Sequence, residues 1–189
     1  GTTSFVADVV GRAGRWTGCG PVGLCGGGRV RGVGGAMVIA CCTGEDGLGL
    51  AGGMGVDIAR DAGDPVTVER ILDATSGDGV EVVLEMSGAQ AALDQALAAI
   101  TRGGRISLLG IFGDPVRVDL SDFVIQKGLR IYGIYGRRIY DTWERTQALL
   151  RSGALDVTPI ITHRLDLADW ERGFELIASR HAGKVVLLP

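Results

Sequence analysis

The chain has 189 residues, of which 46% are hydrophobic and 22% charged, with a formal net charge of -3. This composition supplies enough apolar material for one domain or slightly more. The acidic balance leaves no basic stripe for binding nucleic acid, and no apolar run approaches the roughly 20 residues of a membrane span. We therefore expect neither nucleic acid nor a membrane among its partners.

The four cysteines all lie in the first quarter of the chain: Cys19, Cys25, Cys41 and Cys42. None forms a CxxC pair, and adjacent cysteines seldom bond each other because the geometry is strained. No signal peptide is visible, so we expect reduced thiols in a cytoplasmic protein. The two histidines, His163 and His181, lie too far along the chain to complete a metal cluster with them.

A spaced glycine motif stands in the most glycine-rich part of the chain. Residues 18–23 read Gly-Cys-Gly-Pro-Val-Gly, which has the spacing GxGxxG. In a dinucleotide-binding unit, the first glycine makes a tight turn and the second lets the backbone approach a pyrophosphate. The third allows close packing of helix on strand, and the helix N-terminus attracts the phosphates.

The surroundings of this motif support such a site only in part. Residues 36–42 are typical of the strand that should follow, and residues 46–57 of a weak helix followed by a turn. The preceding segment, however, has Gly14 and Arg15 where apolar residues are expected, and each glycine in the following helix costs about 1 kcal/mol. The acid expected after the second strand is replaced by Cys42. A dinucleotide site and a glycine-rich structural turn both remain open on these residues.

From Pro65 onward, helical and strand patterns alternate regularly. We expect helices over 65–79, 89–100, 119–128 (with Ser121 as a candidate cap) and 138–153, and strands over 80–88, 104–113 and 129–136. Such alternation predicts an α/β fold, a doubly wound parallel sheet with helices on both faces. After residue 154, an extended segment, a helix and a closing strand form a separate layer.

Several stretches in this second part, in order, resemble the C-terminal half of the L-threonine 3-dehydrogenases. They are VVLEMSGA, GGRISLLGI, the long segment from IYGIYGRR to PIITHRL, and GFELIASRHAGKVVLLP. That group belongs to the zinc-dependent medium-chain alcohol dehydrogenases. The resemblance spans nearly the whole chain and is strongest over 65–189. It implies an NAD-binding Rossmann domain over 1–153 and, over 154–189, C-terminal elements of a catalytic domain otherwise missing from these residues.

The resemblance also implies a reaction, the NAD-dependent oxidation of L-threonine to 2-amino-3-oxobutanoate by a homo-oligomer, a dimer or tetramer. The family holds its zinc through an N-terminal domain, whose ligands are absent from these 189 residues. We therefore expect no catalytic or metal-binding residue here, and no activity from this chain alone. A related polyol or alcohol dehydrogenase and a non-catalytic nucleotide-binding or assembly module are the alternatives.

The cofactor contacts of the family carry over to matching positions. The glycine turn falls on Gly18, Gly20, Pro21, Val22 and Gly23; the ribose position on Cys42; and the two loops beside the nicotinamide on Leu109, Gly110 and Ile111 and on Ile134 and Tyr135. Cys42 replaces an acid and Gly47 replaces an arginine, so the choice between NAD and NADP is left open. Glu45 is a candidate to reach the ribose instead.

The remaining conspicuous side chains have structural and functional interpretations. Glu85 ends a strand at the cofactor edge, where it could approach the nicotinamide or a substrate ammonium; a satisfied structural carboxylate is the favoured interpretation. Trp143 and Trp170 are expected to be core or interface anchors. His163 is expected to be a hydrogen-bonded structural residue and His181 a surface residue. The pair Arg137–Arg138 is expected at the surface, with a substrate or subunit contact as the alternative.

Overall fold

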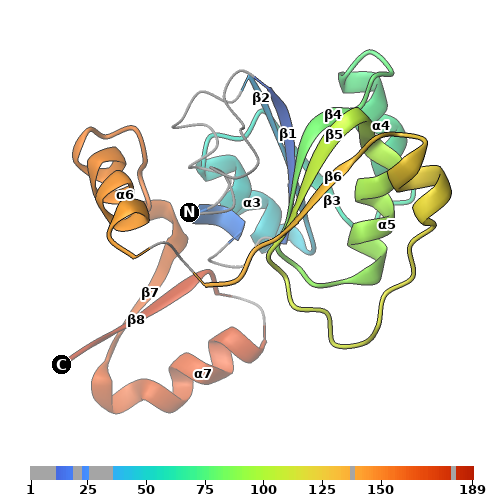
Figure 1. Cartoon of the computed structure of the whole chain (residues 1–189). Coiled ribbons are helices and arrows are strands. Elements are labelled where there is room, and N and C mark those ends of the chain that lie inside the picture. Colours follow the sequence, from blue (N-terminus) through green and yellow to red (C-terminus); the bar gives the residue numbers. More distant parts are fainter. Residues whose placement is uncertain (1–11, 19–22, 26–35, 137–138, 180–181) are drawn as a thin grey trace.

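The computed structural model describes residues 12–18, 23–25, 36–136, 139–179 and 182–189. Helices and strands alternate along most of this length (Figure 1). In chain order the elements are β1 (Ala13–Thr17), β2 (Met37–Cys42), α3 (Glu45–Gly53), β3 (Ile58–Asp61), α4 (Thr67–Ala74), β4 (Val80–Glu85), α5 (Gln90–Ala99), β5 (Ile100–Leu108), η1 (Leu120–Ile125), β6 (Arg130–Gly133), α6 (Asp141–Arg151), η2 (Thr158–Ile160), β7 (Ile161–Asp166), η3 (Leu167–Asp169), α7 (Trp170–Ala178) and β8 (Lys184–Leu188).

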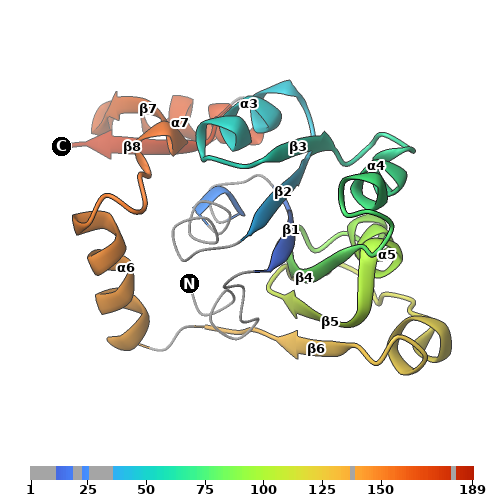
Figure 2. The same cartoon turned by 90° about the horizontal axis from the view of Figure 1, so that it is seen from above.

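Strands β1 to β6 form one sheet in the order β3-β2-β1-β4-β5-β6, and every neighbouring pair is parallel. The chain starts in the middle, builds outward to β3, and then returns to β4 on the other side of β1 (Figure 2). The strand order therefore reverses between β1 and β4. In open α/β sheets, ligands bind outside the carboxyl ends of the strands at such a point. The predicted doubly wound fold is confirmed.

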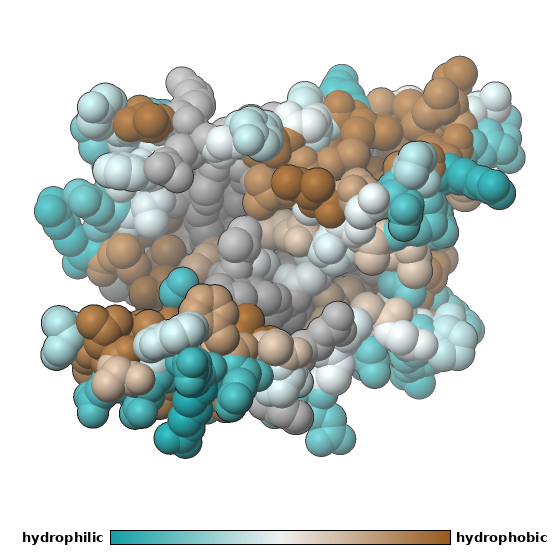
Figure 3. Space-filling view, turned by 90° about the horizontal axis from the view of Figure 1, so that it is seen from below, coloured by the Kyte–Doolittle hydropathy of each residue, from teal (hydrophilic) through white to brown (hydrophobic). Residues whose placement is uncertain are grey.

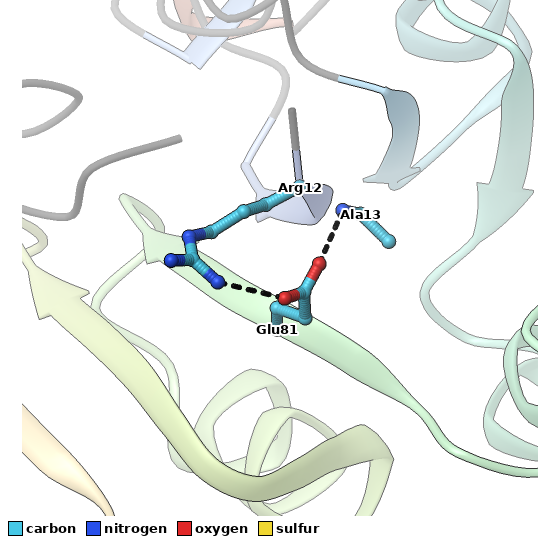
Figure 4. A network of polar contacts seen from close by, with 3 residues as sticks. All are labelled: Arg12, Ala13 and Glu81. Carbon is cyan, nitrogen blue, oxygen red and sulfur yellow. Dashed lines mark hydrogen bonds and ion pairs between the residues drawn. The ribbon is translucent and has the colours of Figure 1, made fainter. Parts of the chain in front are cut away.

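Strand β1 forms although Gly14 and Arg15 are poor strand residues, because it is paired on both sides. It hydrogen-bonds with β2 and with β4, so both edges of its backbone are satisfied by neighbours. A side chain of β4 also secures its beginning: Glu81 accepts hydrogen bonds from the Arg12 guanidinium at 2.8 Å and from the Ala13 amide at 3.1 Å (Figure 4). The strand that should precede the glycine motif is thus present.

Two hydrophobic clusters cover the sheet, and alternate residues of β4 belong to different ones. Val82 and Leu84 pack in a cluster with Ala51 of α3, whereas Val83 packs in a cluster with Ile71 of α4 and with the buried face of α5. Because successive side chains of a strand point to opposite faces, the clusters lie on opposite sides of the sheet. Helices α4 and α5 lie together on one side and α3 on the other (Figure 2).

Three details differ from the sequence-based expectations. The sheet has an edge strand, β3, that follows the expected turn and was not predicted. Strand β5 begins at Ile100 and ends at Leu108, earlier than expected at both ends. The expected helix over 119–128 is a single π-helical segment, and its cap is Asp119, whose carboxylate accepts a hydrogen bond from the Asp122 amide. Ser121 lies inside this segment and is not the cap.

The last elements form a separate two-stranded parallel sheet of β7 and β8, with α7 packed on it. Gly173 of α7 makes this contact, because a Cβ there would lie 3.4–3.6 Å from side chains of both strands. The extended segment, helix and closing strand predicted after residue 154 are confirmed, whereas a domain boundary at 153/154 stays a prediction. None of the helices in the described ranges has the length and apolar character needed to cross a membrane.

The two tryptophans on helices are not core residues. Trp143 of α6 is 51% exposed and Trp170 of α7 is 49% exposed. Trp170 packs edge-on against Phe174 one turn later, with ring centroids 5.9 Å apart. The expectation of core anchors was therefore wrong, because each tryptophan keeps about half of its surface exposed; the interface alternative stays a prediction.

Candidate dinucleotide-binding site

The glycine motif begins where β1 ends, beside the start of the loop after β4. Gly18 has φ of +87°, and its amide donates to the carbonyl of Cys41 at 3.2 Å. A Cβ on Gly18 would lie 3.1 Å from the Ser87 nitrogen, and one on Gly23 would overlap the carbonyl oxygen of Gly18. Glycine is thus favoured at position 18 by the positive φ, and at position 23 because a side chain would collide with the Gly18 carbonyl. Gly20, Pro21 and Val22 lie outside the described residues.

The loop after β5 folds back onto the loop after β4. The amides of Leu109 and Gly110 donate to the carbonyl of Glu85 at 2.8 and 3.2 Å. A Cβ on Gly110 would overlap the nitrogen of Gly88, and one on Gly88 would overlap the carbonyl oxygen of Ile111. The two loops therefore touch backbone to backbone, a contact that only residues without a side chain permit.

The loop after β6 joins the same group. The amide of Ile134 donates to the carbonyl of Leu108 at 2.9 Å, which extends the pairing of β5 and β6 to the sheet edge. Ile111 is 83% exposed and Tyr135 is 95% exposed. Figure 3 shows the molecule from below the view of Figure 1, the side on which the loop after β5 lies. Apolar side chains gather on that face among polar ones. The two predicted nicotinamide loops thus present apolar surface at this edge.

Glu85 is a buried carboxylate at the centre of these loops. It is 0% exposed and accepts hydrogen bonds from the Thr17 hydroxyl at 3.2 Å, the Ser87 amide at 2.8 Å and the Gly88 amide at 3.0 Å, and also from the Ser87 hydroxyl. Buried carboxylates are tolerated when such donors satisfy them. Of the two interpretations given above, the satisfied carboxylate matches this arrangement.

Cys42 ends β2 at the expected ribose position and is buried. It is disulfide-bonded, whereas Cys25 and Cys41 carry thiols. The expectation of reduced thiols was therefore wrong for Cys42, because sequence spacing does not show which cysteines the fold brings together. Local desolvation raises the pKa of the Cys25 thiol, although the residue is exposed at the surface. Glu45 stands exposed at the start of α3, shortly after Cys42.

The other candidates fall away from this edge or outside the described residues. The Nδ1 atom of His163, on β7, lies 2.9 Å from the Thr162 hydroxyl, which fits a hydrogen-bonded structural histidine. His181 and the pair Arg137–Arg138 lie outside the described residues. No cluster of three or more His, Cys, Asp or Glu side chains able to hold a metal occurs within the described ranges.

Sequence reasoning missed Thr17, Ser87 and Gly88 as parts of the candidate site. Each stands directly beside a predicted site element: Thr17 precedes the glycine motif, and Ser87 and Gly88 follow the strand that ends at Glu85. A polar residue, or a serine–glycine pair, at the carboxyl end of a buried strand was the available signal.

The strand order and the glycine turn at its reversal point define a Rossmann-like α/β fold. A family model described as zinc-binding dehydrogenase matches residues 21–152. The chain therefore belongs to the zinc-binding dehydrogenase family.

Among curated proteins, the chain is similar to L-threonine 3-dehydrogenases. It is 41% identical to that of Bacillus velezensis over 91% of this chain and 50% of the relative, and 40% identical to that of Thermococcus kodakarensis over 99% and 54%. Among solved structures, an alcohol dehydrogenase from Thermotoga maritima aligns with a TM-score of 0.86 at 30% identity, over 96% of this chain and 51% of that one. The chain thus spans about half the length of the curated relatives it matches.

Proposed function

We propose that this chain supplies the cofactor-binding part of an NAD-dependent dehydrogenase that oxidises L-threonine to 2-amino-3-oxobutanoate. The observation that carries the proposal is the identity of about 40% with L-threonine 3-dehydrogenases over nearly the whole chain. The glycine turn at the reversal of strand order supports a dinucleotide as the ligand. A cytoplasmic homo-oligomer, with a small-molecule alcohol as substrate, belongs to the same proposal.

The proposed binding mode follows from the geometry of the sheet edge. The pyrophosphate would lie beside Gly18 at the end of β1, where a dinucleotide-binding fold has its glycine motif. The nicotinamide would lie against the loops that hold Leu109 to Ile111 and Ile134 to Tyr135. Their exposed apolar side chains would shield the ring from water. In this arrangement the protein orients the ring, and the cofactor accepts the hydride.

Zinc, which the family name implies, finds no fitting ligand set in the described residues. We therefore derive no step through a metal from this chain. Cofactor choice rests on the end of β2, where Cys42 stands in place of the acid that hydrogen-bonds the ribose of NAD. A buried sulfur offers weaker hydrogen bonding than a carboxylate. We expect weaker NAD binding than an acid would give, with a smaller preference over NADP.

Isothermal titration of the purified chain with NAD⁺ and with NADP⁺ tests the proposal. The matched variants are Gly18→Ala and Gly77→Ala, because both glycines have φ near +90° (87° and 88°) but Gly77 has open space around it and lies after α4. We expect Gly18→Ala to abolish binding and Gly77→Ala to retain it. Equal effects of the two substitutions would contradict a site at the glycine turn.

The substrate is tested by NADH formation with L-threonine and with 2,3-butanediol in the presence of zinc. The second alcohol is chosen because a 2R,3R-butanediol dehydrogenase from Bacillus subtilis aligns with a TM-score of 0.85 at 26% identity. A preference for L-threonine, in a longer protein that contains this chain, would support the proposal. Preference for the diol would favour the polyol dehydrogenase, and cofactor binding without turnover in that protein would favour a nucleotide-binding module.

A further inference from the structure

Glu85 connects three segments that are distant in sequence. Its carboxylate accepts the Thr17 hydroxyl at the end of β1 and the amides of Ser87 and Gly88 after β4. Its backbone carbonyl accepts the amides of Leu109 and Gly110 after β5. One residue therefore contacts the end of β1, the loop after β4 and the loop after β5, at the carboxyl edge of the sheet.

The contacts of this side chain require an acceptor at both oxygens. Its Oε1 atom accepts from Thr17, Ser87 and Gly88, and its Oε2 atom accepts a longer bond, 3.3 Å, from the Gly88 amide. The Oε2 atom also lies 2.7 Å from where a Cβ on Gly110 would stand. In glutamine, an NH2 group would replace Oε2. Its N–H groups would face the Gly88 N–H, which cannot accept a hydrogen bond, and a backbone that has no room to move.

The same strand carries a second glutamate that serves as a comparison. Glu81, at the other end of β4, also accepts a backbone amide and pairs with an arginine, but it is partly exposed. Its partners are Arg12 and Ala13, at the amino end of β1 (Figure 4). The two glutamates thus bind β4 to β1 at opposite ends of the sheet, and only Glu85 touches the loops of the candidate site.

We propose that Glu85 is a positioning residue: its carboxylate holds the end of β1 and the loop after β4, and the close contact of that loop with Gly110 and Ile111 then fixes the loop after β5 in the arrangement that presents Gly110 and its neighbours to a nicotinamide ring. The inference rests on the proposed function for the identity of the ligand. It assigns no contact between Glu85 and the cofactor, because the carboxylate is fully buried beneath the loops.

The test compares Glu85→Gln with Glu81→Gln in the full 189-residue chain. Three quantities are measured: the Kd for NAD⁺, the fluorescence of bound NADH at saturation, and amide hydrogen exchange over 86–89 and 109–112. We expect Glu85→Gln to raise the Kd about tenfold, to change the emission of bound NADH, and to speed exchange in both loops. Glu81→Gln should leave the Kd within about twofold and the emission and loop exchange unchanged.

Emission at saturation separates positioning from general support of the fold, because a merely destabilised protein still binds NADH in the same surroundings once the site is full. Equal Kd, emission and exchange in the two variants would overturn the proposal. If Glu85→Gln does not fold, Ser87→Ala removes one donor to the carboxylate and should shift the same quantities in the same direction, about threefold in Kd. No shift in that variant would also overturn the proposal.

Failure of the proposed function would give a different pattern. If the unsubstituted chain binds neither NAD⁺ nor NADP⁺, the dehydrogenase proposal fails, while hydrogen exchange still decides on Glu85. Faster amide exchange confined to 86–89 and 109–112 in Glu85→Gln would show that Glu85 keeps these two loops in place. Unchanged exchange there would overturn it.

Discussion

Substitution of Gly110 by alanine tests the close contact between the loops after β4 and β5. An added Cβ would overlap the Gly88 nitrogen and stand 2.7 Å from Glu85 Oε2 and 2.8 Å from the Gly88 Cα. Two of these neighbours are backbone atoms and the third is a carboxylate held by several donors, so none can rotate away. Gly110 has no positive φ, so the cost is a matter of space and not of backbone strain.

The expected cost follows from overpacking of a well-packed site, which destabilises proteins by about 1–3 kcal/mol. We take about 2 kcal/mol for Gly110→Ala, which lowers the Tm by roughly 4–8 °C in a chain of this size. Gly113→Ala is the matched control, because Gly113 belongs to the same loop and has no neighbour within 4 Å of an added Cβ. It should be neutral or stabilise by up to about 1 kcal/mol, since alanine restricts the unfolded chain.

Urea unfolding followed by circular dichroism measures both free energies of unfolding. The reasoning predicts a difference of about 2–3 kcal/mol between the two variants, with Gly110→Ala the less stable. If the two variants unfold at the same urea concentration with the same m-value, the loops do not touch as described. Titration with NAD⁺ gives a second readout, because displacement of the loop would weaken binding in Gly110→Ala and not in Gly113→Ala.

Four other outcomes are expected. Ile106→Ala, in the buried cluster of α4 and α5, should cost about 2–5 kcal/mol in urea unfolding because it leaves a cavity between sheet and helices; a cost below 1 kcal/mol would contradict its burial. Asp119→Ala should cost about 1 kcal/mol as the loss of a cap, whereas Ser121→Ala should change stability by less than about 0.5 kcal/mol; the reverse order would restore Ser121 as the cap. Glu81→Gln should cost about 1 kcal/mol, because its ion pair with Arg12 is partly exposed to solvent, and high salt should reduce that cost. Cys25 should react with iodoacetamide more slowly at neutral pH than an ordinary exposed thiol, because local desolvation raises its pKa although the residue is exposed, and only the thiolate is reactive; a midpoint of reactivity at or below that of an ordinary thiol would contradict the raised pKa.

The elements after Pro65 could be predicted from sequence because their patterns are strong. The apolar run at the start of β4 and the alanine- and leucine-rich α5 each have one dominant interpretation, and both were found close to their observed bounds. Strand β3 was missed because its four residues, Ile-Ala-Arg-Asp, mix apolar and charged side chains, as a short strand at a sheet edge can. Its pairing with β2 supplies the order that its own sequence does not show.

The candidate site was predictable in position but not in its connections. Leu109 and Gly110 follow a recognisable buried strand, so their place at the sheet edge follows from topology. That their amides donate to the carbonyl of Glu85, and that Gly88 packs against Ile111, depends on how two loops fold over each other. Such contacts involve backbone atoms of residues distant in sequence, and side-chain patterns carry no record of them. The disulfide bond of Cys42 was missed because which cysteine side chains meet depends on the fold.

The glycine-rich beginning of the chain weakens the predicted site less than its composition suggests. Strand β1 is held by backbone bonds to β2 and β4, and the Gly18 amide donates to the Cys41 carbonyl, in a place where an added Cβ would meet the Ser87 backbone. Since these interactions involve no side chain of the motif, a glycine-rich sequence can form them at the cost of a larger loss of chain entropy on folding. That cost is reduced wherever a bound dinucleotide stabilises the folded state, because a ligand that binds only the folded protein adds its binding free energy to stability. If the proposed site is real, NAD⁺ should therefore raise the Tm of this chain in proportion to the logarithm of its concentration above Kd, and a Tm independent of NAD⁺ would leave the glycine motif as a structural turn.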